Sequence, residues 1–189
     1  MEKWDVYTAE GEPTGRTVVR GTGTLKSGEY HLVVHVWPYN DYGSLLIQKR
    51  TKTRRMMPNI WAATGGAAIA GETSLEAAKR ELYEELGILA QEGQLQPVKR
   101  LKRRNSLLDI WAIHTDAYVP EMTLQKSEVA KAKWVSFSTL NSMIKSGEYH
   151  DYGKEYFAQI HRLVADIKVK KAKEDSVGIS NEKALWEFL

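Results

Sequence analysis

Short runs of apolar and β-branched residues, separated by turn-forming residues, predict strands along much of the chain. The Val-rich run at 31–37 is followed by the turn sequence 38–43 and a second apolar run at 44–48, which together predict a hairpin. Further strands are predicted at 4–7, 107–115 and 133–135, and a turn at 10–13, where Gly and Pro occur together.

Helical spacing of apolar residues is typical of three other segments, 74–86, 138–144 and 154–173. The last of these carries an apolar stripe made of Tyr156, Phe157, Ile160, Leu163, Val164 and Ile167. Such a stripe predicts a helix that packs on the body of the protein. Strands interleaved with few helices predict an α/β (α+β) fold class.

Composition excludes several kinds of function. The 189 residues are 42% hydrophobic and 27% charged, as in an ordinary soluble domain, and the absence of Cys excludes disulfide scaffolds, Cys–zinc sites and cysteine nucleophiles. A net charge of +3 is too small to indicate a nucleic acid polymer as partner. The apolar runs are too short to span a membrane, and the acidic N-terminal residues do not resemble a signal peptide, so we expect a cytoplasmic protein.

The segment 74–86 carries the clearest chemical signal. Thr73 with Glu76 forms a capping box that starts a helix, and Gly87 is the residue type that ends one. Leu75, Ala78, Leu82 and Leu86 form its expected apolar stripe, and Glu81, Glu84 and Glu85 gather on one patch of its surface. Clustered carboxylates repel one another, and a divalent cation with oxygen ligands, Mg²⁺ or Mn²⁺, removes the repulsion. The alternative is a solvated charged face.

The spacing of the surrounding residues decides between these alternatives. The chain contains a Gly, a Glu six residues later and, after seven more residues, the pattern Arg-Glu-apolar-any-Glu-Glu-any-Gly-apolar. The matching residues are Gly66, Glu72, Arg80, Glu81, Leu82, Glu84, Glu85, Gly87 and Ile88. This pattern resembles the signature of the Nudix hydrolase family, and a chance match is rarer than about one in a hundred million starting positions. Arg80 can pair with Glu84 one turn away or with Glu72 in the preceding loop.

The resemblance implies an α/β/α sandwich with a mixed sheet, in which the signature forms a loop–helix–loop. It also implies a metal-dependent enzyme that cleaves a nucleoside or other organic diphosphate, a small-molecule substrate. By the resemblance, Glu81, Glu84, Glu85 and the Gly65 carbonyl bind the metal, and Gly66, Glu72, Arg80 and Gly87 are structural. Glu81 and Glu84 are then also candidate catalytic residues.

Residues outside the signature complete the expected site. Glu128 stands six residues before Trp134, a common place for a further catalytic acid in the family, although a solvent-exposed loop Glu is the alternative. Arg50, Arg54 and Arg55 follow a predicted strand, where they could bind a diphosphate. Arginines in such a place can also be merely solvated.

The segments 2–7, 15–16, 30–37, 45–50 and 58–61 resemble the type 1 isopentenyl-diphosphate isomerase branch of the superfamily. The positions of the isomerase's reactive Cys and of a metal-binding His are Gly65 and Ala67 here, and two further metal positions are Thr24 and Leu107. His31 matches an isomerase His, and Asp109 lies where a catalytic acid is expected. We interpret the chain as a hydrolase with an isomerase-like framework.

The expected organisation is a Nudix domain at 1–150 and a C-terminal helix and tail at 151–189 that pack on it, as a monomer or homodimer. Residues 176–189 are expected to be a loosely attached tail, whose Trp186, Phe188 and Leu189 could dock on the domain or on a second copy. Nucleoside and isoprenoid diphosphates both remain open as substrates. Two alternative functions remain: the isomerase, which the absence of Cys disfavours, and a non-catalytic Nudix ligand-binding module, which the complete signature disfavours.

Overall fold

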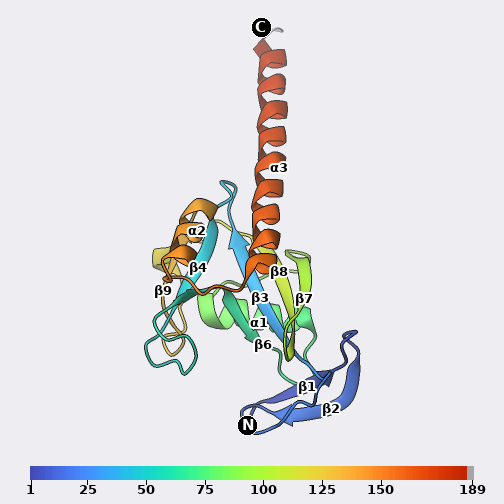
Figure 1. Cartoon of the computed structure of the whole chain (residues 1–189). Helices are drawn as coiled ribbons and strands as arrows, with labels where there is room; N and C mark the ends of the chain where they lie inside the picture. The colour runs from blue at the N-terminus through green and yellow to red at the C-terminus, as the bar shows by residue number, and fades with distance from the viewer. Residues whose placement is uncertain (187–189) are drawn as a thin grey trace.

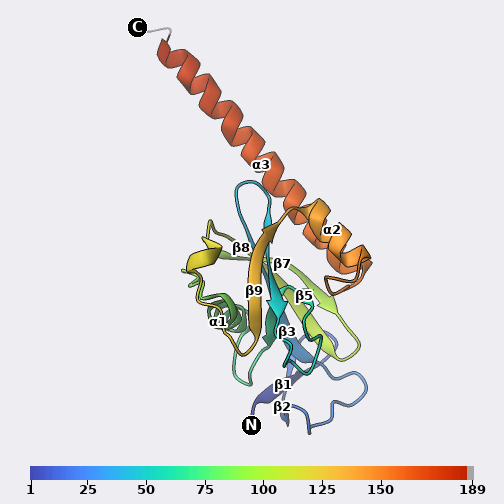
Figure 2. The ribbon, with the colours of Figure 1, turned by 90° about the vertical axis from the view of Figure 1, so that its left-hand side faces the viewer.

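The computed structural model describes the backbone of residues 1–186 and the side chains of residues 1–175. Within that part, one mixed sheet lies between helices on both of its faces (Figures 1 and 2). Its strands are β3 (His31–Tyr39), β4 (Leu45–Arg50), β5 (Trp61–Ala62), β6 (Thr64–Ala67), β7 (Leu95–Lys102), β8 (Ser106–His114) and β9 (Val129–Val135). The helices are α1 (Ser74–Leu86), α2 (Phe137–Lys145), α3 (Lys154–Trp186) and the short 3₁₀ helix η1 (Val119–Glu121). The predicted α/β/α sandwich is confirmed.

The order of strands in the sheet is β5-β4-β3-β8-β7, with β6 also paired to β3 and β9 to β4. β3 and β8 are parallel, and the other pairs are antiparallel. The predicted hairpin connection between β3 and β4 is present, but the two strands pair only at Tyr39 and Leu45. Beyond that point β3 pairs with β6, which leads directly into the loop before α1. This divergence therefore positions the signature loop beside the central strand.

Alternation along β3 supplies both sides of the core, because successive side chains of a strand point to opposite faces. Val34 and Val36 pack with Ala77, Leu82 and the rest of the α1 side. One sequence expectation for α1 is wrong: Leu75 is 37% exposed, and Ala77 is buried in its place. The buried stripe is thus shifted around the helix, so that Glu85 also points inward.

The opposite face of the sheet is covered by α2 and the beginning of α3. Trp37 of β3 packs there with Leu140 of α2 and with Tyr156, Ile160 and Val164 of α3. The helix α3 begins where the sequence predicts but continues past residue 173, and its C-terminal half projects away from the body (Figures 1 and 2). The expected docking of Trp186, Phe188 and Leu189 lies outside the residues whose side chains are described.

A separate two-stranded antiparallel sheet, β1 (Lys3–Tyr7) and β2 (Pro13–Val19), lies at the end of the molecule away from the projecting part of α3 (Figure 1). We call it the N-terminal hairpin. Sequence patterns predict β1 but miss β2, β5, β6 and β7, and they place the start of β9 four residues too late. Among the described helices, none has the length and apolarity needed to cross a bilayer.

Candidate active site

The loop–helix–loop of the signature is built by local interactions. The Thr73 hydroxyl accepts a hydrogen bond from the Glu76 backbone N–H at 3.2 Å, and the Glu76 carboxylate accepts one from the Thr73 backbone N–H at 2.8 Å. This is the predicted capping box, and it satisfies backbone groups that a helix N-terminus leaves free. Gly87 ends α1 in the left-handed conformation at φ 69°, and its N–H bonds to the Tyr83 carbonyl.

The two glycines before α1 allow the backbone to approach its neighbours closely. Gly65 has φ 144°, and a Cβ atom there would lie 2.0 Å from the Val34 carbonyl oxygen. A Cβ atom on Gly66 would lie 2.5 Å from Oε1 of Glu81. Both distances are below van der Waals contact, so any larger residue would displace the strand or the Glu81 carboxylate. Glycine at these positions lets Glu81 lie directly against the loop backbone.

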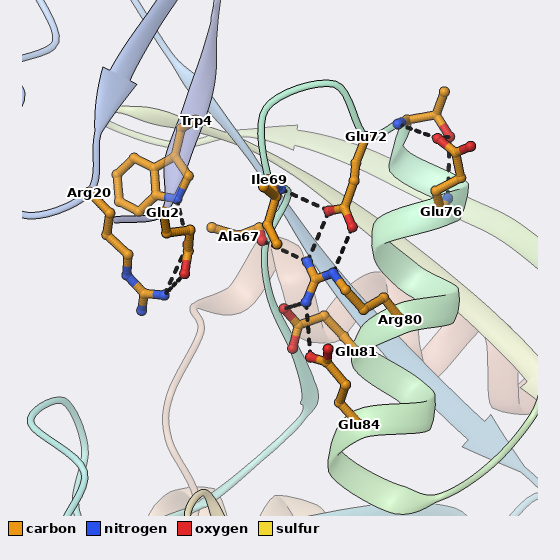
Figure 3. Close-up of polar contacts among 11 residues, drawn as sticks. Glu2, Trp4, Arg20, Ala67, Ile69, Glu72, Glu76, Arg80, Glu81 and Glu84 are labelled. Carbon is orange, nitrogen blue, oxygen red and sulfur yellow. Dashed lines mark hydrogen bonds and ion pairs between the residues drawn. The ribbon is translucent and has the colours of Figure 1, made fainter.

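Arg80 ties the loop to the helix (Figure 3). Its Nε donates to Glu72 at 2.7 Å, and its Nη1 donates to Glu81 at 2.8 Å and to Glu84 at 3.1 Å. Its Nη2 donates to the Ala67 carbonyl at 3.1 Å. Both predicted pairings, with Glu72 and with Glu84, are therefore formed at once. The hydrogen bond with Glu72, followed by the negative charge of Glu81, raises the pKa of Arg80, so this guanidinium is permanently charged.

A cavity of about 260 Å³ opens beside this clamp. Its walls include seven of the predicted site residues: Arg54, Gly65, Gly66, Arg80, Glu81, Glu84 and Glu128. The lining also includes Ala67, which the sequence identifies only as the counterpart of an isomerase His. Sequence reasoning missed the remaining lining residues, which are Glu2, Arg20, Ile69 and Gln125. The predicted residues Arg50, Arg55, Glu72, Glu85 and Gly87 are not part of the lining. The cavity thus gathers carboxylates from α1 and from the segment before β9 against the signature loop.

Glu85 lies behind the cavity wall and is 1% exposed. Its Oε2 accepts hydrogen bonds from the Gly65 backbone N–H and from Nε2 of Gln48, both at 2.8 Å. Burial, and after it the negative charge of Glu81, raises the pKa of Glu85 to about 8. Gln48 was missed by sequence reasoning, and the signal that could have found it is a polar residue within the apolar strand β4.

Glu81 is also crowded by negative charge. Burial raises the pKa of its carboxyl group, Arg80 opposes that effect, and the charges of Glu84 and Glu128 add to it. Excess negative charge held around one cavity, with only oxygen donors, fits a hard divalent cation such as Mg²⁺ or Mn²⁺.

A second group of possible ligands, Asp41, His114 and Asp116, is exposed and lies at the other end of β3 and β8. His114 and Asp41 form an ion pair at 2.8 Å, which explains why the side chains of this group lie close together.

Glu128 and Arg54 form an ion pair at 2.7 Å in the cavity lining, each with 27% of its side chain exposed. The Thr51 backbone N–H donates to the Glu128 carbonyl at 2.9 Å, which joins the loop 51–60 to the segment before β9. Of the three predicted arginines, Arg54 alone lines the cavity. Arg50 is buried and its Nε donates to the Met56 carbonyl within the same loop, whereas Arg55 is exposed.

The two residues that match isomerase positions lie outside the cavity lining. His31 is buried and stacks on Trp4 with a centroid distance of 4.1 Å, and burial lowers its pKa to about 4. Asp109 accepts hydrogen bonds from Nε and Nη2 of Arg100 at 2.6 and 2.7 Å. Both residues therefore have structural partners.

An α/β/α sandwich in which a glycine loop and a glutamate-rich helix meet at a polar, carboxylate-lined cavity is the architecture expected for the family that the signature resembles. The family model described as NUDIX domain matches residues 29–157, and the chain belongs to this family of diphosphate-cleaving hydrolases. Its members generally use divalent metals.

Several relatives are similar to the chain over much of its length. An uncharacterized Nudix hydrolase of Listeria monocytogenes is 41% identical over 80% of this chain and 90% of its own. Nudix hydrolase 3 of Arabidopsis thaliana is 31% identical over 76% of this chain but only 20% of its own. The crystal structure of DR0079 from Deinococcus radiodurans shares the fold with a TM-score of 0.71 at 22% identity, over 85% of this chain and 98% of that one.

Proposed function

We propose that this protein is a Mg²⁺- or Mn²⁺-dependent hydrolase that cleaves the diphosphate linkage of a nucleoside or other organic diphosphate. The observation that carries the proposal is the cavity in which Glu81, Glu84 and Glu128 meet the signature loop at Gly65. The family assignment supports the same reaction class.

In this proposal Glu81, Glu84 and the Gly65 carbonyl would hold the cation from the cavity wall, and Glu85, which lies behind that wall, would be the further ligand. When bound, the cation neutralises phosphate oxygens and lowers the pKa of water. Glu128 accepts a proton from the attacking water, with Glu81 as the other candidate base. Arg54, which neutralises Glu128 in the free protein, donates hydrogen bonds to phosphate oxygens once substrate is present. The water oxygen forms a bond to phosphorus as the bridging P–O bond breaks.

Isomerisation of isopentenyl diphosphate is disfavoured by the geometry of the signature loop. That reaction protonates one carbon and deprotonates another, and the isomerase uses a Cys for one of these steps. The chain has no Cys, and the matching position, Gly65, leaves 2.0 Å between a Cβ atom and the Val34 carbonyl oxygen. No side chain can be placed there without moving the strand.

A screen of diphosphate compounds tests the proposal. The purified protein is incubated with nucleoside diphosphates, nucleotide sugars and prenyl diphosphates, with Mg²⁺ or Mn²⁺, and released phosphate or monophosphate is measured. Glu84→Gln removes one ligand charge from an exposed residue while keeping its shape, so it should fold normally and lose most turnover. Undiminished turnover in Glu84→Gln, or no cleavage of any compound by the wild type, would contradict the proposal.

A further inference from the structure

The N-terminal hairpin forms one wall of the candidate active site, although it precedes the part of the chain that matches the family model, which starts at residue 29. Glu2 and Arg20, which flank the ends of its strands, line the same cavity as Glu81 and Glu84. Figure 3 shows both side chains on the opposite side of Ala67 from Arg80. The hairpin therefore adds charged groups that the family signature does not contain.

Several contacts fix the hairpin against the signature loop. The Ala70 backbone N–H donates to the Lys3 carbonyl at 2.8 Å, and the Gly71 N–H donates to Oδ2 of Asp5 at 2.7 Å. On the other side, the Trp4 indole stacks on His31 of β3. Because the hairpin is held both by the loop and by the central sheet, the groups it carries into the cavity are pre-positioned.

Glu2 and Arg20 present a donor and an acceptor side by side. Nη1 of Arg20 donates to both carboxylate oxygens of Glu2, at 2.8 and 3.0 Å, and the Trp4 Nε1–H donates to one of them at 2.9 Å. The guanidinium carbon of Arg20 lies 5.9 Å from the centre of the Trp4 ring. The side chains remain 49% and 30% exposed, for Arg20 and Glu2 respectively, so a ligand in the cavity can reach them.

We propose that Arg20 and Glu2 are specificity-determining residues that recognise a hydroxyl-bearing group linked to the substrate's diphosphate. A hydroxyl both donates and accepts, so a sugar can bond to the carboxylate and the guanidinium together. An apolar prenyl chain in the same place would displace water from both charged groups. It would offer no hydrogen bonds in place of those that the water made. Ala67 and Ile69 are the apolar side chains of the lining, too few to enclose such a chain. This inference rests on the proposed function.

Steady-state kinetics with UDP-glucose and isopentenyl diphosphate test the inference. The wild type should prefer UDP-glucose by at least about a hundredfold in kcat/KM, because a site built to bond hydroxyls rejects a substrate without them. Arg20→Gln should raise the KM for UDP-glucose about tenfold or more and keep kcat within about threefold. It should not raise the KM for isopentenyl diphosphate, because the variant has one charge fewer to desolvate. Arg20→Lys should restore part of the loss, and Glu2→Gln should act on UDP-glucose in the same direction.

Arg16→Gln is the matched control, because Arg16 lies on the same hairpin but pairs with Glu29 outside the cavity lining. It should match the wild type for both substrates. Equal effects of Arg20→Gln and Arg16→Gln would overturn the inference. So would an equal loss on both substrates in Arg20→Gln, because Arg20 would then bind only the diphosphate that they share.

The failure of this inference can be separated from failure of the proposed function. If the wild type cleaves isopentenyl diphosphate in preference to UDP-glucose, hydrolysis stands and the inference is wrong. If the wild type cleaves neither, calorimetric binding of UDP-glucose in Mg²⁺ decides. If Arg20→Gln weakens the binding of UDP-glucose about tenfold and Arg16→Gln leaves it intact, the inference is supported without hydrolysis. If UDP-glucose does not bind, or binds equally to the wild type and Arg20→Gln, the inference is overturned.

Discussion

Glu85→Gln tests the electrostatics of the candidate site through protein stability. The raised pKa of Glu85 means that the folded protein holds this proton more tightly than the unfolded chain does. Ionisation of Glu85 therefore destabilises the fold, and that cost appears as the pH rises from about 4.5 to about 8. At 1.36 kcal/mol per pKa unit, the interval from 4.5 to about 8 corresponds to about 5 kcal/mol at most.

Glutamine at this position removes the ionisation but keeps the contacts. One oxygen, Oε2, accepts the hydrogen bonds from both Gly65 and Gln48, and the Gln carbonyl oxygen can accept the same two. The neutral amide also removes the repulsion from the Glu81 charge. In metal-free buffer we therefore expect Glu85→Gln to match the wild type near pH 4.5 and to exceed its unfolding free energy by about 2–5 kcal/mol at pH 8.5.

Urea unfolding in EDTA, repeated across this pH range, measures the difference. A stability difference that is independent of pH, or a wild type that is the more stable protein at pH 8.5, would show that ionisation of Glu85 does not destabilise the fold. Addition of Mg²⁺ should raise the unfolding free energy of the wild type as the metal concentration increases. Glu85→Gln should gain less unfolding free energy, because it has lost a ligand charge. Equal gains would remove Glu85 from the metal site.

Two further substitutions probe the chemistry. Glu128→Gln should lower turnover by about 10²-fold or more if Glu128 is the base, the usual scale for positioned proton transfer, and an effect below a few-fold in kcat would move that role to Glu81. Gly66→Ala should displace the Glu81 carboxylate, because the new Cβ would lie 2.5 Å from its Oε1. Its turnover should fall at least about tenfold while the circular dichroism spectrum stays native. Turnover equal to that of the wild type would show that displacement of Glu81 does not affect catalysis.

The parts of the fold that local interactions determine could be predicted from the sequence. The helix α1 is the clearest case, because its capping box, its terminal glycine and its Glu spacing all lie within one short segment. The strand β6 could not be predicted, because its sequence Thr-Gly-Gly-Ala has no strand preference and is extended only through backbone pairing with β3. The edge strand β7 could not be predicted either, because its polar residues and Pro97 give it no recognisable strand pattern.

The same distinction applies to the candidate site. Glu81, Glu84 and Glu85 are found by spacing along one helix, and the structure adds that Glu85 points into the core while Glu84 is exposed. Gln48 and Arg20 approach the site from β4 and the N-terminal hairpin, far away in sequence. Their contribution depends on tertiary contacts, such as the hydrogen bond of Gln48 with Glu85, that no local pattern records.

We propose that the cavity supports hydrolysis of a diphosphate linkage and not isomerisation of a double bond. One NMR experiment compares the two directly: the protein is incubated in Mg²⁺ buffer with a mixture of UDP-glucose, UDP and isopentenyl diphosphate, and ³¹P and ¹H spectra are followed. We predict loss of diphosphate signals with the appearance of monophosphate products, and no dimethylallyl diphosphate. Formation of dimethylallyl diphosphate at about one turnover per second or faster, with no monophosphate released, would show that the protein is an isomerase and not a hydrolase.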